Sequence, residues 1–163
     1  MTAANGIDMP RREPSGPCLI LGYDRCESAR HAVNWATSEL KSGGKLVIVH
    51  ACRPLHMLPA PLSTPDERHQ FERALLDELM LDGNDELLDI EFVVEVSDED
   101  PVTALTEAAR RHHASAIVVG CEQHSRLQKA IGTVTSELLA RSSVPVTAVP
   151  CARAGLTVAG DRS

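Results

Sequence analysis

The sequence is short of aromatic rings. Phe, Trp and Tyr together make up 2% of its 163 residues, so a core has to be built from Leu, Val, Ile and Ala. Few rings leave little surface on which nucleobases can stack, and a formal net charge of −7 at pH 7 repels a phosphate backbone. We therefore expect no nucleic-acid partner, and we expect a core of buried aliphatic strands.

Long hydrophobic runs are also missing. No apolar stretch approaches the ~20 residues of a membrane span, and residues 1–17 lack the apolar segment of a secretory signal. These absences predict a cytoplasmic protein without a membrane partner.

Motifs of familiar catalytic sites are missing as well. The chain contains no GxSxG elbow, no P-loop lysine after a glycine loop and no HExxH. No pairing of a nucleophile with a base stands out, so we name no catalytic residue and expect at most a slow ATPase activity.

What the chain does contain is a regular alternation of two patterns. Short apolar runs indicate strands covered on both faces, and between them apolar residues recur at helical spacing. The patterns predict one α/β domain over residues 18–150, with a five-stranded, mostly parallel sheet and helices on both of its faces, between flexible tails at 1–17 and 151–163. The predicted strands are 18–23, 45–51, 88–96, 116–120 and 144–149, and the predicted helices are 26–41, 133–141 and two that begin at Pro65 and Pro101. Pro145, inside the last predicted strand, cannot donate to a ladder and so predicts an edge strand.

Ligands of such sheets collect at the carboxyl ends of the strands. Those ends carry Asp24, Ala51 and residues 98–101 and 120–133. In the last of these stretches a polar loop leads from a buried strand to a glycine that opens a helix. The free N–H groups of such a helix start form a natural anion-binding site.

Two carboxylates stand just before predicted helices. Asp24 and Asp100 are expected to cap the helices that follow. The run Asp98–Asp100 also has the oxygen ligands of a divalent cation site, but a solvated turn with Asp100 as the cap is the interpretation we favour. His50, inside an apolar strand, is interpreted as a satisfied core histidine.

The five cysteines are odd in number and widely spaced, without a CxxC pair. We interpret them as reduced thiols, several of them buried like small apolar residues. The alternative is a zinc or redox site at which Cys26, Cys52 and Cys121, each just after a strand, converge with His124. No short-range pair of ligands supports that site, so we expect no metal.

Three stretches of the chain resemble the universal stress protein family. They are LILGYDRCESARHAVNWA at 19–36, DPVTAL at 100–105 followed by AIVVG at 116–120, and GTVT at 132–135 followed by SVPVTAV at 143–149. Each is weak alone, but their order and spacing are specific. The resemblance implies a three-layer fold of the adenine nucleotide alpha hydrolase type. It also implies a stress-response role as a homodimer that pairs through its last strand, here Val144, Val146 and Ala148.

Many members of this family bind ATP. The resemblance therefore implies that ATP or another adenine nucleotide binds at the carboxyl ends of the strands. It places the site at Gly22, Asp24, Ala51, Gly120, Gly132, Thr133, Val134 and Thr135.

The glycine loop departs from the family pattern. Gln123 stands where a second glycine is expected, Glu122 adds a carboxylate, and the interval from Gly120 to Gly132 is one residue short. Glutamine resists the close approach and positive φ that glycine allows, at a cost of about 1 kcal/mol or more, whereas Arg25 is a candidate to offset the added charge. Two interpretations stay open: a degenerate nucleotide pocket, or an interaction dimer of the same fold that binds no nucleotide.

Overall fold

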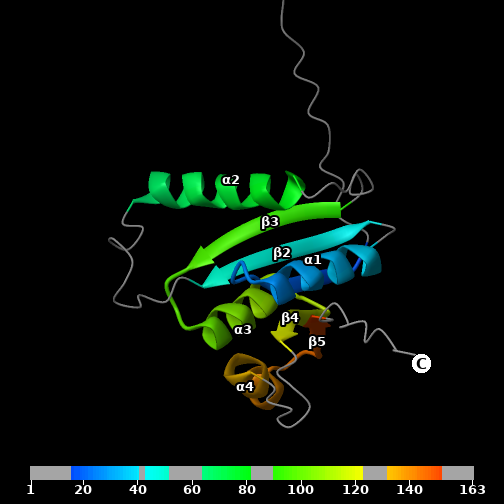
Figure 1. Ribbon diagram of the computed structural model, residues 1–163. Helices are drawn as coiled ribbons and strands as arrows, with labels where there is room; N and C mark the ends of the chain where they lie inside the picture. The colour runs from blue at the N-terminus through cyan, green and yellow to red at the C-terminus, as the bar shows by residue number, and fades with distance from the viewer. Residues whose placement is uncertain (1–15, 41–42, 52–63, 82–89, 123–131, 152–163) are drawn as a thin grey trace, which may run out of the picture.

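The computed structural model describes residues 16–40, 43–51, 64–81, 90–122 and 132–151. Strands and helices alternate along the chain (Figure 1). The strands are β1 (Cys18–Gly22), β2 (Gly44–Ala51), β3 (Ile90–Ser97), β4 (Ala116–Glu122) and β5 (Val146–Cys151), and the helices are α1 (Glu27–Glu39), α2 (Pro65–Leu81), α3 (Pro101–Arg111) and α4 (Thr133–Arg141).

The sheet is parallel throughout, with the strand order β3-β2-β1-β4-β5. β1 lies in the middle and pairs with both β2 and β4. The chain places β2 and β3 on one side of β1 and then crosses to the other side to place β4 and β5, so the strand order switches direction beside β1. This arrangement confirms the predicted fold class. Ligands of such sheets bind at the carboxyl ends of the strands next to that switch.

β5 is an edge strand as predicted, but the proline argument for it was misplaced. Pro145 precedes the strand and contributes its carbonyl oxygen, which accepts a hydrogen bond from Ile117 N–H at 2.9 Å. Pro150 is the proline within β5. The strand also runs on to Cys151, which the sequence pattern had assigned to the tail.

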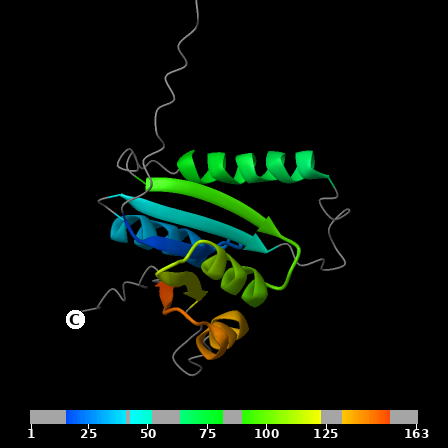
Figure 2. The ribbon, with the colours of Figure 1, turned by 180° about the vertical axis from the view of Figure 1, so that it is seen from behind.

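Two aliphatic layers enclose the sheet. α1 and α2 cover one face, where Leu21, Ile48 and Leu75 are fully buried. α3 and α4 lie side by side on the other face, over Ile20 and Val47 (Figure 2). Figure 1 shows α2 and α3 on opposite sides of the curved sheet. Because both faces of the central strands are buried, their sequences show no polar alternation.

Side chains cap three of the helices. Thr64 and Glu67 form a reciprocal capping box at the start of α2, with N···O distances of 3.1 and 3.2 Å. Asp100 caps α3 by accepting from Thr103 N–H at 3.1 Å, as predicted. For α1 the prediction was wrong, because the cap is Cys26, whose sulfur accepts from Ala29 N–H at 3.4 Å.

The end of α3 is tied to the edge strand β3 through Glu95. One carboxylate oxygen lies 2.6 Å from His112 Nε2 and the other bonds the Arg111 guanidinium. Burial by itself would raise the pKa of Glu95, but the hydrogen bonds from His112 and Arg111 outweigh it and lower the pKa. The helix end and the strand are therefore held together by an ionised carboxylate.

None of the described helices is long and apolar enough to cross a membrane.

Candidate functional site

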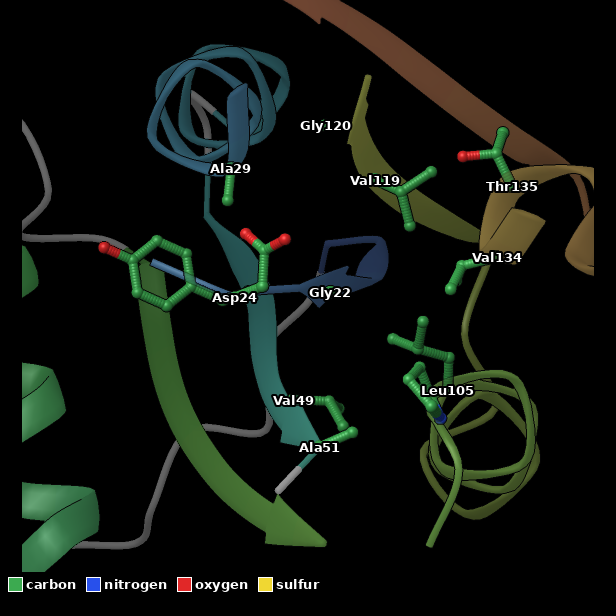
Figure 3. A pocket seen from close by; sticks show the side chains of 12 residues that line it. Gly22, Asp24, Ala29, Val49, Ala51, Leu105, Val119, Gly120, Val134 and Thr135 are labelled. Carbon is green, nitrogen blue, oxygen red and sulfur yellow. The ribbon is translucent and has the colours of Figure 1, made fainter. Parts of the chain in front are cut away.

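A cavity of about 150 Å³ opens at the carboxyl ends of β1, β2 and β4 (Figure 3). Most of the residues that the resemblance assigned to a nucleotide site line it. They are Gly22, Asp24, Ala51, Gly120, Val134 and Thr135. Gly132 and Thr133 are not part of the lining; they are exposed at the start of α4.

Asp24 supplies the charged side chain of the cavity wall. It follows β1 directly, and its Oδ1 accepts a hydrogen bond from Cys26 N–H at 3.0 Å. This local hydrogen bond fixes the orientation of the Asp24 carboxylate, which does not cap α1. Figure 3 shows Asp24 and Thr135 on opposite sides of the cavity, so a ligand between them meets a carboxylate on one side and the start of α4 on the other.

The floor of the cavity depends on a missing side chain at Gly22. The parallel register sets Gly22 beside Val49 on β2 and Val119 on β4. A Cβ on Gly22 would lie 3.2 Å from Leu105 Cδ1 and 3.3 Å from Val119 Cγ1. Glycine therefore keeps this space open.

Sequence reasoning missed the apolar part of the wall. It comprises Tyr23, Ala29, Val49, Pro101, Leu105 and Val119. Their patterns indicated core positions, and several are indeed core residues. The signal that could have found them is their place near strand ends and in the first two turns of α1 and α3, where the core meets the ligand edge.

Gly120 has a role that the phosphate-loop interpretation did not include. A Cβ at this position would lie 2.3 Å from the Ser28 carbonyl carbon, 2.4 Å from the Ser28 oxygen and 2.7 Å from Ala29 N. The first turn of α1 therefore rests directly on the β4 backbone. The fold itself requires glycine here, whether or not a phosphate is bound.

The start of α4 carries no side-chain cap. Its N-cap is Gly132, with φ −54° and ψ 155°, and this residue makes no side-chain cap hydrogen bond. Val134 and Thr135, in that first turn, line the cavity, and Thr135 is 4% exposed. The N–H groups of a helix's first turn and the helix dipole favour an anion at this edge of the cavity.

Arg25 does not face the cavity, contrary to the role expected for it. Its guanidinium carbon lies 5.1 Å from the centre of the Phe71 ring on α2, and its Nη2 lies 3.5 Å from a Glu78 oxygen. Its φ of 66° places its backbone in the left-handed region. This backbone and these contacts turn the cation toward α2 and away from the cavity lining.

The acidic run before α3 and the histidine of β2 are accounted for by ordinary packing or capping. The predicted cap by Asp100 is confirmed, and Asp98, for which a solvated turn was expected, also forms an ion pair with Arg68 at 2.8 Å. His50 Nδ1 lies 2.7 Å from the Tyr23 carbonyl oxygen, as expected for a satisfied histidine.

The cysteine site considered from the sequence gains no support from the described residues. Burial, followed by Asp24 as a neighbour, raises the pKa of the Cys26 thiol, which disfavours the reactive thiolate. Cys121 lies half-buried in β4. Cys52, Gln123 and His124 lie outside the described residues, and so do the side-chain surroundings of Glu122.

Comparisons with known proteins agree on one family. The model of the universal stress protein family matches residues 19–150. A comparison with the curated proteins gives no match.

Solved structures share the fold at low sequence identity. A universal stress protein family member from Burkholderia pseudomallei is 23% identical with a TM-score of 0.58, and the match covers 82% of this chain and 96% of that one. A universal stress protein solved in complex with cAMP is 24% identical with a TM-score of 0.54 and the same coverage. One from Archaeoglobus fulgidus, in complex with dAMP, is 20% identical with a TM-score of 0.55, again covering 82% and 96%.

The structural matches establish the fold, and the family model, at residues 19–150, includes every residue that lines the cavity. The chain belongs to the universal stress protein family.

Proposed function

We propose that the chain is a regulatory module that binds an adenine nucleotide in the cavity at the carboxyl ends of β1, β2 and β4. The observation that carries the proposal is the convergence of Asp24, Ala51 and the first turn of α4 on one cavity. Two relatives of the same fold were solved with cAMP and dAMP, which supports an adenine nucleotide as the ligand class.

The parts of the cavity suit different parts of a nucleotide. Ala51 and the apolar wall accommodate a flat base, and the Asp24 carboxylate accepts hydrogen bonds from amino or hydroxyl groups on the base side. The start of α4, whose N-cap is a glycine, attracts phosphate through its helix dipole. The cavity of about 150 Å³ is smaller than the roughly 300–1,000 Å³ of whole-ligand pockets, so it holds the base side while the phosphates lie toward α4.

We expect affinity to be lower than in family members with an intact glycine loop. Arg25 is held by Phe71 and Glu78 rather than by the ligand. Gln123 and Glu122 stand in the loop where glycine and phosphate contacts are expected. Both effects weaken phosphate binding and leave more of the affinity to the base side.

The test is a nucleotide assay on the purified full chain. Adenine nucleotide released on denaturation, or a rise in Tm with millimolar ATP or AMP, supports the proposal. Asp24→Ala should abolish the effect, whereas Asp77→Ala, an exposed carboxylate on α2, should leave it unchanged. No released nucleotide together with no thermal shift refutes the proposal. A shift retained in Asp24→Ala places the ligand elsewhere.

We further propose that two copies pair through the edge strand β5. Ala148 is exposed there, whereas Val146 packs against the core under α3 and α4. Ala148→Glu should therefore give monomers in light scattering without unfolding the domain, and Ala140→Glu, at an exposed position of α4, is the matched control. A dimer that survives Ala148→Glu contradicts the β5 interface, and so does one that Ala140→Glu disrupts equally.

The second candidate is an interaction dimer that binds no nucleotide. The structural role of Gly120 favours it, because this glycine is required by the contact with Ser28 even in an empty protein. A dimer that shows neither bound nucleotide nor a thermal shift would support this function over the first.

A further inference from the structure

The outer side of α1 carries a second group of ligating side chains, none of which lines the cavity. Glu27 and His31 are one helical turn apart on α1, and Cys151 ends β5 beside them. One ligand atom from each, a carboxylate oxygen, a ring nitrogen and a sulfur, lies within 4.8 Å of the other two. We propose that Glu27, His31 and Cys151 form a zinc site.

Regular backbone positions all three residues. The spacing of four residues puts Glu27 and His31 on the same face of α1. α1 packs against both β4 and β5, and Val149 packs into the core beneath α1. Alternation along the strand turns Cys151, two residues later, toward the same helix. Its pairing with Glu122 is the last of the β4–β5 register, so the sheet fixes where the thiol lies.

The distances suit a shared ion after a small adjustment. Zinc binds nitrogen and oxygen at about 2.0–2.2 Å and sulfur at about 2.3 Å, so donors at tetrahedral angles lie about 3.3–3.6 Å apart. His31 Nε2 and Glu27 Oε1 are 4.0 Å apart. The His31–Glu27 separation must shorten by about 0.7 Å, and the widest donor separation by at most about 1.2 Å. The His31 and Glu27 side chains are 44% and 80% exposed, so they can rotate inward by these amounts without disturbing the core.

The donor set selects the metal. A thiolate and an imidazole are borderline-to-soft ligands that zinc prefers, whereas magnesium and calcium prefer oxygens alone. Binding displaces the thiol proton of Cys151 and the Glu27 carboxylate offsets part of the ion's charge. Three protein ligands leave one tetrahedral position for water or an outside group. The site would also fasten the end of β5, the edge strand, to α1.

This site differs from the cysteine cluster considered from the sequence. That cluster was sought among thiols at the carboxyl ends of strands, and it did not include His31 or Glu27. The ligands found here are separated by most of the chain, so no short spacing in the sequence points to them. Packing of α1 against β5 brings them together.

The experiment is metal titration of the reduced, chelator-treated full chain. Calorimetry should show one zinc per chain, and cobalt in its place should give the near-ultraviolet charge-transfer absorption of a thiolate ligand. Cys151→Ser should abolish that absorption. Loss of an outer-shell partner alone typically weakens metal binding about 10–100-fold, so His31→Ala and Glu27→Gln should each weaken zinc binding at least about tenfold.

Two matched variants serve as controls. His69 pairs with Glu72 on α2 at 3.5 Å without a described thiol nearby, so His69→Ala should leave zinc binding unchanged, as should Cys121→Ser. Circular dichroism checks that each variant is folded, which is expected because Glu27 and His31 are exposed. The proposal is overturned if the chain binds no zinc, if the cobalt complex lacks the thiolate absorption, or if that absorption survives in Cys151→Ser.

Discussion

Replacing Gly120 with alanine tests whether this glycine belongs to the fold or to a ligand. The added Cβ would lie 2.3 Å from the Ser28 carbonyl carbon and 2.7 Å from Ala29 N. These are backbone atoms of the first turn of α1, so they cannot rotate away as a side chain would. Overpacking typically costs about 1–3 kcal/mol, and we expect Gly120→Ala at the upper end of that range.

Urea unfolding without nucleotide measures this cost. With a slope of about 2 kcal/mol per molar urea, a loss of about 3 kcal/mol lowers the midpoint by about 1.5 M. For a domain of this size the same loss lowers Tm by roughly 6–12 °C. The nucleotide-free condition matters because a purely ligand-contacting glycine would show no loss there.

Gly132→Ala is the matched control. A Cβ on Gly132 meets no described atom within 4 Å, and its φ of −54° suits any residue. Its cost is limited to a weaker N-cap on α4, less than about 1 kcal/mol. The contact between α1 and β4 does not explain why position 120 is glycine if the urea midpoint of Gly120→Ala equals that of the wild type or is no lower than that of Gly132→Ala.

Substitutions at three further positions test separate contacts of the fold. Thr64→Ala removes half of the α2 capping box and should lower the free energy of unfolding by about 1 kcal/mol in urea at pH 7; an unchanged midpoint would contradict the box. The pKa of Glu95 is lowered in the fold, so its stabilisation is present above the unfolded-state pKa and is lost as the pH falls through the folded one. The stability advantage of wild type over Glu95→Gln should therefore be clear at pH 6 and shrink by pH 3; a constant difference argues against the carboxylate. Arg25→Ala and Arg25→Gly both lose the guanidinium contacts, but at φ 66° alanine should be about 1 kcal/mol less stable than glycine, and equal midpoints would exclude backbone strain.

Local patterns predicted most of the architecture correctly. The unalternating runs around Leu21 and Ile48 indicated strands buried on both faces, and both residues are fully buried between two helical layers. The start of α3 was predicted correctly because Asp100 and Pro101 are typical of a helix start: the carboxylate accepts from first-turn N–H groups, and proline suits the first helical position. At α1 the same reasoning failed, because Asp24 accepts from Cys26 N–H and leaves the cap to a cysteine, a weaker and less expected acceptor.

The candidate site was predictable only in part. Asp24, Ala51 and the α4 start follow from the rule that parallel strands present their carboxyl ends at one edge. The apolar wall did not follow, because Val49 and Leu105 have the pattern of ordinary core residues. Only the strand register sets Val49 beside Gly22, and only the packing of α3 brings Leu105 there. The role expected for the positive charge of Arg25 was wrong, because the guanidinium lies over the ring of Phe71, a residue far along the chain.

Which segments become strands and helices, and in which order, follows from the sequence alone, because periodicity and caps act over a few residues of backbone. That order in turn implies the parallel sheet. Tertiary packing decided which distant groups meet: it set Ser28 against Gly120, turned Arg25 toward α2, and brought Cys151 beside Glu27 and His31. Those contacts depend on how whole elements pack, and packing is fixed by the sum of many buried contacts that no short stretch of sequence contains.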